Sequence, residues 1–305
     1  MPPITPAAVT PAPVTIKQAL VCAAALGLDR LDGQLLLLQA LGKADTDRAW
    51  LLSHDDDQLA AAAVDVFNQL CARRAAGEPL AYIAGYKEFF GLLLNVDARV
   101  LVPRPDTETL VQWAIDLLPV RPVDRLDVLD LGTGSGAIAL AIAHHCQKAS
   151  LNVRILAVDA SCDALTLARE NAGRLGLGDA IRFAKADWLD GVSGQFELIV
   201  SNPPYIASAD PHLQALAHEP LQALASGADG LDDIGRIINA APLHLMHDGW
   251  LLLEHGYDQS TRVCELLVNR GYQKVQSRAD LAGHSRCSGG QWLPRQIPDN
   301  QQLEF

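Results

Sequence analysis

The segment Ser201-Asn202-Pro203-Pro204-Tyr205 follows an apolar run and combines residue types that suit chemistry at a planar nitrogen. An amide or aromatic amine is a poor nucleophile because its lone pair is delocalised. The side-chain oxygen of Asn202 and the carbonyl of Pro203 could accept the two N–H bonds of such a nitrogen, which would orient it and stabilise its developing charge. Tyr205 would pack against the flat group. We therefore expect Asn202, Pro203 and Tyr205 to be catalytic, and residues 202–205, with Pro204, to bind the substrate.

A glycine-rich loop follows an earlier apolar run, in Asp130-Leu131-Gly132-Thr133-Gly134-Ser135-Gly136-Ala137. Glycines let the backbone turn tightly and approach a ligand closely, and the helix expected next would present free N–H groups and its positive dipole end. Five residues are therefore predicted to contact a cofactor: Gly132, Thr133, Gly134, Ser135 and Gly136. The spacing Gly132-x-Gly134-x-x-Ala137 also satisfies a relaxed dinucleotide fingerprint, so the loop alone permits NAD as well as S-adenosylmethionine.

Two further apolar runs end in residues that suit an adenosyl group. Asp159 comes somewhat over twenty residues after the glycines, where an acid can accept hydrogen bonds from ribose hydroxyls. Asp187 and Trp188 follow the next run, where an aromatic ring can stack on adenine beside an acid that contacts its amino group. The alternatives are that Asp159 caps a helix and that Trp188 covers the edge of the core.

The elements that would position these residues alternate between strands and helices from residue 126 onward. A helix is expected over Asp232–Met246, before the last of five predicted strands: Leu126–Leu131, Val153–Asp159, Ile181–Ala184, Phe196–Ser201 and Trp250–Glu254. Such alternation predicts a mostly parallel sheet with helices on both faces. Ligands of these sheets lie beyond the carboxyl ends of the strands, which is where the candidate residues occur.

The chain before this region has a different character. Residues 1–15 are rich in Pro, Ala and Thr and are expected to be a disordered leader. Residues 16–78 show apolar spacing typical of helices and predict a small helical docking domain. Residues 79–105 predict a β-hairpin linker, with strands within Leu80–Phe90 and Leu92–Val102, and residues 106–305 form the α/β domain. Asp106 or Thr107 is expected to cap a helix over Thr107–Leu118.

Composition limits the classes of function. The chain has 305 residues, 49% of them hydrophobic, and a net charge of −12. This acidity disfavours nucleic acid as the partner, because phosphate contacts call for basic residues. No apolar run is long enough to span a membrane, and no signal peptide is evident. Six scattered cysteines without a paired spacing favour a reducing, cytoplasmic location and predict no metal site.

Taken together, the motifs make the sequence similar to the protein-(glutamine-N5) methyltransferase family, and most closely to its release-factor-specific branch, the HemK or PrmC type. The resemblance covers nearly the whole chain. It includes Gly77–Ile83, Val102–Glu108, Asp130–Ala137, Ala157–Asp159, Asp187-Trp188, Ser201–Ile206, Glu219-Pro220, Gly230-Leu231, Leu253–Gly256 and Asp280–Gly283. Asn-Pro-Pro-Tyr is shared with DNA adenine methyltransferases, whereas the Pro-Arg-Pro-Asp-Thr-Glu block is typical of the release-factor branch.

The resemblance implies a Rossmann-like, class I methyltransferase fold with a seven-stranded, mostly parallel sheet, an N-terminal helical bundle and a β-hairpin linker. It implies S-adenosylmethionine as cofactor and, as substrate, the glutamine in the Gly-Gly-Gln loop of class I peptide-chain release factors. Gly132–Gly136, Asp159, Trp188 and Asn202 fall on the family's cofactor contacts, and Asn202–Tyr205 on its glutamine-binding motif. Neither direct nucleic-acid binding nor membrane attachment is implied.

Several alternatives stay open at this point. The substrate could be a glutamine of a ribosomal protein, or an adenine whose N6 is methylated by the same motif on a flipped base. A NAD-dependent oxidoreductase is compatible with the glycine loop, but such an enzyme has no need of the Asn-Pro-Pro-Tyr segment. A non-catalytic scaffold with an inactive site is a third class of protein. Gly289-Gly290-Gln291 reproduces the expected substrate tripeptide within this chain. It is interpreted as chance or as a turn before the last strand, rather than as a site of self-methylation.

Overall fold

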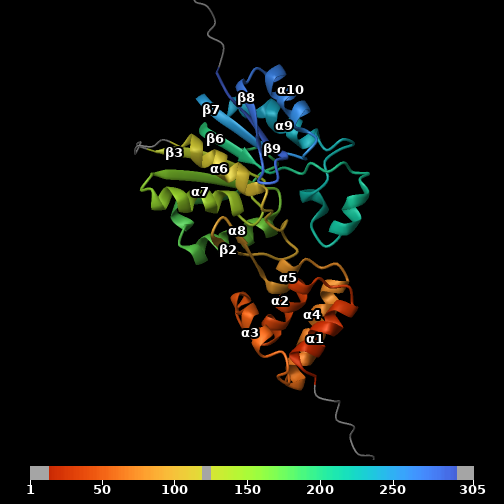
Figure 1. Ribbon diagram of the computed structural model, residues 1–305. Helices are drawn as coiled ribbons and strands as arrows, with labels where there is room; N and C mark the ends of the chain where they lie inside the picture. The colour runs from red at the N-terminus through yellow and green to blue at the C-terminus, as the bar shows by residue number, and fades with distance from the viewer. Residues whose placement is uncertain (1–13, 119–124, 294–305) are drawn as a thin grey trace, which may run out of the picture. The chain divides into compact units, whose positions relative to one another are not determined.

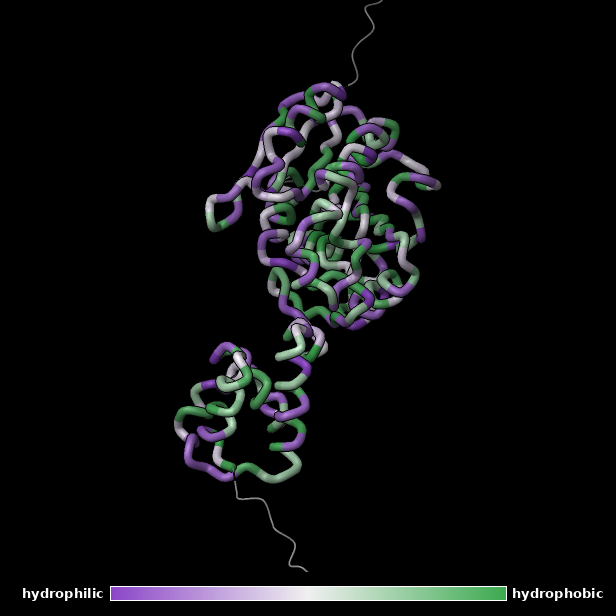
Figure 2. Tube along the Cα trace, turned by 90° about the vertical axis from the view of Figure 1, so that its right-hand side faces the viewer, coloured by the Kyte–Doolittle hydropathy of each residue, from purple (hydrophilic) through white to green (hydrophobic). Residues whose placement is uncertain are grey.

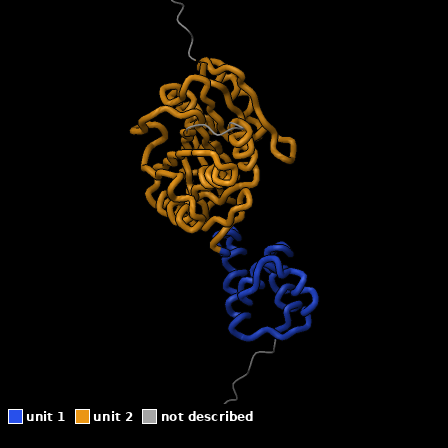
Figure 3. Tube along the Cα trace, turned by 90° about the vertical axis from the view of Figure 1, so that its left-hand side faces the viewer, with its two compact units in different colours: residues 1–84 blue, residues 85–305 orange. Residues whose placement is uncertain are grey.

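The computed structural model describes residues 14–118 and 125–293. By its internal contacts the chain divides into two compact units between Ala84 and Gly85 (Figure 3). Most of the leader and the end of the C-terminal tail lie outside the described residues. Among the described residues, every named strand lies in the second unit, and the first unit is built of helices.

The first unit is a bundle of short helices around its own apolar core. Its 3₁₀ turn η1 covers Asp45–Asp47, and its α-helices are α1 (Ile16–Ala25), α2 (Arg30–Ala40), α3 (Arg48–Ser53), α4 (Ala61–Ala75) and α5 (Leu80–Ala84). Helix α1 begins with a capping box between Thr15 and Gln18. The fully buried leucines of α2 and Phe67 of α4 belong to this core. The expected helical N-terminal region is confirmed.

The expectation of a strand throughout Leu80–Phe90 is wrong in its first half. Pro79 precedes a helical turn in which the backbone N–H groups of Tyr82 and Ile83 donate to its carbonyl, and proline is well tolerated at such a start. Only strand β1 (Tyr86–Phe89) remains, and it pairs antiparallel with β2 (Leu92–Asn95) across a turn at Gly91. The hairpin is confirmed, but residues after Asn95 form an irregular segment instead of continuing the second strand.

A single seven-stranded sheet organises the second unit (Figure 1). Its order is β5-β4-β3-β6-β7-β9-β8. The strands are β3 (Leu126–Leu131), β4 (Val153–Asp159), β5 (Ile181–Lys185), β6 (Phe196–Ser201), β7 (Leu245–Glu254), β8 (Gln273–Ala279) and β9 (Ser285–Gln291). The five strands from β5 to β7 in this order are parallel, and β9 is antiparallel to both of its neighbours. The expected Rossmann-like, mostly parallel sheet is confirmed.

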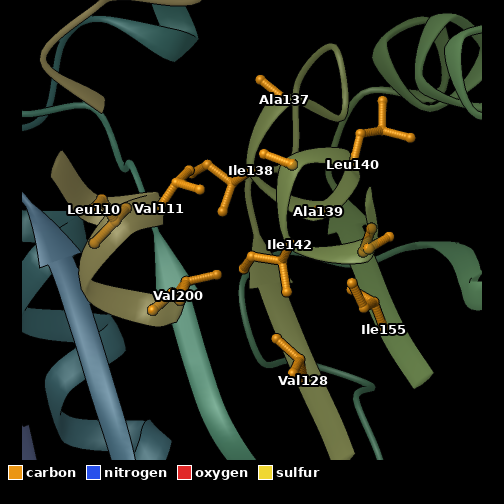
Figure 4. Packing of buried hydrophobic residues seen from close by; sticks show 14 of the residues in the cluster. Leu110, Val111, Val128, Ala137, Ile138, Ala139, Leu140, Ile142, Ile155 and Val200 are labelled. Atoms are coloured by element: carbon orange, nitrogen blue, oxygen red, sulfur yellow. The ribbon is translucent and has the colours of Figure 1, made fainter. Parts of the chain in front are cut away.

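Helices cover both faces of this sheet. They are α6 (Thr107–Leu117), α7 (Ala137–Lys148), α8 (Cys162–Leu175), α9 (Asp232–Ala240) and α10 (Ser260–Arg270), with 3₁₀ turns η2 (Gly178–Ala180), η3 (Pro211–Leu216), η4 (Leu221–Ala223) and η5 (Ala241–Leu243). One core cluster joins α6 and α7 to the sheet, and its members include Val111, Ile142, Val128 and Val200 (Figure 4). A second cluster joins α9 and α10 to the other face. The hydrophobic stretches run through the interior of this unit (Figure 2).

Two expected bounds near the C-terminal strands are wrong. The helix expected over Asp232–Met246 ends at Ala240, because Pro242, in the 3₁₀ turn that follows, cannot continue an α-helix. Strand β7 begins at Leu245, five residues before the predicted Trp250. The Gly-Gly-Gln tripeptide forms no turn before a strand. Gly289 and Gly290 pair with Leu252 and Leu251 inside β9. Gln291 is buried there and its amide donates to a backbone carbonyl, so it is no accessible methyl acceptor.

Candidate active site

A cavity of about 420 Å³ lies at the carboxyl ends of β3, β4, β5 and β6. The candidate residues meet there because adjacent parallel strands end at the same edge of the sheet. Gly132, Thr133, Gly134, Ser135, Asp159, Asp187, Trp188, Asn202 and Pro204 all line it. Gly136, Pro203 and Tyr205 are not among its lining residues.

The glycine loop turns sharply between β3 and α7. Gly132, Gly134 and Gly136 adopt φ values of +70°, +55° and +87°, a region that favours glycine. Asp130 holds the loop from below: its Oδ2 accepts from the Thr133 hydroxyl at 2.6 Å and from the Ala139 N–H at 3.3 Å. Complete burial raises the pKa of this carboxyl to about 7, although both donors oppose the rise. These hydrogen bonds fix the backbone of the glycine loop where it lines the cavity.

Asp159 is the last residue of the neighbouring strand β4 and faces the glycine loop. Its Oδ2 accepts from the Gly134 N–H at 2.9 Å, and its Oδ1 accepts from the Ser161 N–H at 2.8 Å. Burial raises the pKa of Asp159 in spite of these backbone donors. A carboxylate has about four acceptor positions, so the side chain keeps capacity for ribose hydroxyls. Ser161, by contrast, is the residue that caps α8 through its side chain.

Trp188 is held by contacts on two sides. Its indole Nε1 donates to Asp233 Oδ1 at 2.8 Å, and a Cβ on Gly132 would lie 3.1 Å from the ring. Asp187 forms an ion pair of 3.1 Å with Arg236 of α9. Sequence reasoning missed both Asp233 and Arg236, although each lines the cavity. They lie on a helix whose packing no local motif indicates.

The Asn-Pro-Pro-Tyr segment approaches the cavity through Asn202 and Pro204. Asn202 Nδ2 donates to the Thr107 hydroxyl at 3.1 Å, which leaves Oδ1 as the acceptor of this amide. Pro203 is buried. The Tyr205 ring packs against the second core cluster, and its hydroxyl donates to Glu254 Oε1 at 3.2 Å. Burial, followed by the charge of Glu254, raises the pKa of Tyr205 above its usual value.

A further wall of the cavity comes from the irregular segment before α6. Arg104 forms a 2.5 Å ion pair with buried Glu219, whose other oxygen accepts from the Val102 N–H at 3.0 Å. This contact ties the Pro-Arg-Pro-Asp-Thr-Glu block to the turn that contributes Pro220 and Gln222 to the lining. Both motifs resemble those of the family, but neither was predicted to belong to the site.

The fold and the cavity together define a class I methyltransferase. Residues 17–85 match the family described as PrmC N-terminal domain, and residues 113–254 match the methyltransferase small domain. A release factor glutamine methyltransferase of Xylella fastidiosa is 46% identical over 275 residues, covering 89% of this chain and 96% of the relative. One from Bordetella pertussis is 45% identical, covering 87% and 95%. The chain belongs to the release factor glutamine methyltransferase family.

A solved methyltransferase from Pyrococcus furiosus shares the fold at 21% identity. Its TM-score is 0.51, with 72% of this chain and 98% of that chain covered. None of the helices within residues 14–118 and 125–293 has the length and apolar character that a membrane span requires.

Proposed function

We propose that this protein transfers a methyl group from S-adenosylmethionine to the side-chain amide nitrogen of the glutamine in the Gly-Gly-Gln loop of class I release factors. The observation that carries the proposal is the orientation of Asn202. Its Nδ2 is engaged by Thr107, so its Oδ1 is the atom that can accept an N–H from a substrate amide in the cavity. The family membership supports glutamine as the group that enters.

The cavity suits S-adenosylmethionine. Backbone N–H groups of the glycine loop, at the start of α7, would bind its carboxylate. Asp159 has acceptor capacity for the ribose hydroxyls, and Trp188 offers an aromatic face for the adenine. When bound, the cofactor supplies a methyl group carried on a positively charged sulfur. That electrophile needs no covalent intermediate on the enzyme.

The work left to the protein is positioning and electrostatic stabilisation. Asn202 Oδ1 and the Pro203 carbonyl would hold the two N–H bonds of the glutamine amide and point its nitrogen at the methyl group. The same two acceptors stabilise the positive charge that appears on nitrogen as the new bond forms. The proton then leaves to water, because the methylated nitrogen is strongly acidic before it loses that proton.

The partner is thus a protein, and the reaction takes place in the cytoplasm, where release factors act. We assign docking of the release factor to the helical domain of residues 16–78, joined by the linker of residues 79–105 to the methyltransferase domain of residues 106–305. This division is supported by the match of residues 17–85 to a family of their own.

Mass spectrometry of a recombinant release factor after incubation with this protein and S-adenosylmethionine tests the proposal. We expect a gain of one methyl group on the glutamine of the Gly-Gly-Gln loop. A release factor with glutamate at that position is the matched control and should gain none. If a ribosomal protein or adenine in nucleic acid were methylated while the release factor stayed unmodified, the proposed substrate would be wrong. The assignment of the active site would still hold.

A further inference from the structure

We infer that Asp233 is a positioning residue that connects the cofactor side of the cavity to its acceptor side, so that each ligand strengthens binding of the other. The inference rests on the proposed function, which places S-adenosylmethionine at Trp188 and the release-factor glutamine at the Asn-Pro-Pro-Tyr segment. The contacts that carry it belong to the second unit alone. Asp233 belongs to none of the sequence motifs of the site.

Asp233 lies in the first turn of α9 and forms hydrogen bonds in two directions. On one side, its Oδ1 accepts from Trp188 Nε1 at 2.8 Å. On the other side, its Oδ2 accepts from the hydroxyl of buried Ser226 at 2.7 Å, and its own N–H donates to the Ser226 oxygen at 2.9 Å. The two carboxylate oxygens belong to one rigid planar group. A movement of the indole that carries Oδ1 with it therefore also moves the oxygen that holds Ser226.

The indole of Trp188 depends on α9 for its position. Trp188 has a φ of +53°, a conformation that a bulky residue rarely adopts and that persists only where surrounding contacts enforce it. Arg236 of α9 holds both ends of this turn through ion pairs with Asp187 at 3.1 Å and Asp190 at 3.8 Å. Asp233 holds the ring itself. An adenine stacked on the ring would fix it further and, through Nε1, would fix the Asp233 carboxylate.

Ser226 lies at the base of a loop that follows the Asn-Pro-Pro-Tyr segment. Three backbone hydrogen bonds of 2.9 Å close this base, from Ser226 to Ile206, from Ile206 to Leu224 and from Ser208 to Gly227. They delimit the loop of residues 207–223, drawn in teal beside the sheet in Figure 1. Three residues of this loop line the cavity: Pro220, Gln222 and Ala223. Since Ile206 directly follows Tyr205, the base of the loop is continuous with the segment that would bind the acceptor.

The contacts thus form one path from the adenine wall of the cavity to the acceptor segment. The path runs from the Trp188 indole through the Asp233 carboxylate and the Ser226 hydroxyl to the backbone of Ile206. A bound cofactor that fixes the indole therefore orders the base of the 207–223 loop before the release factor binds, and the release factor has less to order. By linkage, a bound release factor tightens binding of the cofactor by the same factor.

The affinity of the release factor with and without S-adenosylhomocysteine measures this coupling, because the spent cofactor fills the site without methyl transfer. In wild type, we expect it to tighten release-factor binding by about 5-fold or more. Ser226→Ala removes the hydroxyl but leaves Trp188 bonded to Asp233. Its affinity for the spent cofactor should therefore stay close to that of wild type, while the gain in release-factor affinity is lost.

Ser208→Ala is the matched control for Ser226→Ala. It makes the same substitution at the base of the same loop, at an exposed side chain, and keeps the backbone N–H that donates to Gly227. The gain in release-factor affinity should equal that of wild type in S208A. An undiminished gain in S226A would overturn the inference.

Trp188→Phe breaks the path at its other end and keeps the test decisive where Ser226→Ala does not fold. It preserves a ring for the adenine but removes the donor to Asp233. The gain in release-factor affinity should therefore fall in W188F as well. In the double variant W188F/S226A it should fall no further, because both changes interrupt the same path. Losses that add in the double variant would show two independent routes and would contradict the role of Asp233.

Hydrogen–deuterium exchange gives a readout that needs no release factor. Saturating S-adenosylhomocysteine should slow exchange of the Ile206 amide in wild type and S208A, and leave it unchanged in S226A and W188F. Slowing of equal size in S226A would show that the ligand acts on the loop directly, through lining residues such as Gln222, and would overturn the inference. Absence of slowing in wild type would overturn it too. The expected slowing, with a release factor that neither binds nor gains a methyl group, would overturn only the proposed function.

Discussion

Gly230 packs directly against the backbone of Tyr205, in the segment that carries the proposed methyl acceptor site. A Cβ on Gly230 would lie 2.0 Å from the Tyr205 carbonyl oxygen, and the residue has a φ of +76°. Gln259 Nε2 donates to the same carbonyl at 3.0 Å. The loop before α9 and the turn after β7 thus hold the Asn-Pro-Pro-Tyr segment in place from behind.

Gly230→Ala should therefore destabilise the protein and displace the site. We expect a loss of about 1–3 kcal/mol from overpacking, with a further cost of about 1 kcal/mol for the left-handed backbone. Urea unfolding and the methyl-transfer rate measure the two effects. Gly235→Ala in α9 is the control, because a Cβ there meets nothing within 4 Å. It should stabilise the helix by about 0.5–1 kcal/mol. Equal stability of the two variants would contradict the packing argument.

Asn202→Ala should remove the acceptor for the developing charge. Turnover is expected to fall by about 10²-fold or more, as for loss of one electrostatic stabiliser. Steady-state kinetics with a release factor measure the change. Asn239→Ala, on the exposed side of α9, is the control and should leave turnover unaffected. Turnover near that of wild type in N202A would refute the role assigned to Asn202.

The raised pKa values of two buried carboxyl groups predict how the stability of the protein changes with pH. Burial raises the pKa of Asp130 from 3.8 to about 7, and that of Glu254 from 4.5 to about 7. Each group binds its proton more tightly in the folded chain than in the unfolded chain. The stability it contributes is therefore present below pH 4 and is lost as the pH rises to about 7.

Chemical denaturation between pH 5 and pH 8 checks this sign. Wild type should lose stability over this range, with a slope of at most about 1.4 kcal/mol per pH unit from each group. Asp130→Asn and Glu254→Gln cannot ionise, so each should flatten the curve, and the double variant should flatten it further. Curves parallel to that of wild type would show that these carboxyl groups ionise in the folded state as they do in the unfolded chain.

The strands that carry the site could be predicted closely from the sequence. The bounds of β3, β4 and β6 agree with expectation because each is a short apolar run that ends at a glycine loop, an acid or a proline pair. Parallel strands that neighbour each other bring Gly132, Asp159 and Asn202 to one edge, so their convergence follows from topology.

Contacts between distant elements could not be predicted in this way. Thr107 was expected to cap α6, but neither it nor Asp106 makes a side-chain cap. Its hydroxyl instead meets Asn202, 95 residues away. Asp233 meets Trp188 over a separation of 45 residues. Such partners depend on how α6 and α9 pack on the sheet, and nothing in the spacing of the residues encodes this.

Substitutions of Trp188 test whether this aromatic residue after β5 binds the cofactor or only covers the core. If its ring stacks on adenine, Trp188→Ala should weaken binding of S-adenosylmethionine by about 10- to 100-fold, given 1–3 kcal/mol for base–aromatic stacking. Trp188→Phe keeps a ring but loses the donor to Asp233, so its loss of affinity should be smaller. Calorimetric titration measures both. Trp292→Phe, whose ring packs on Tyr272 outside the cavity lining, is the control and should bind as wild type does. Lowered melting temperatures of W188A and W188F with wild-type affinity would assign Trp188 to the core instead.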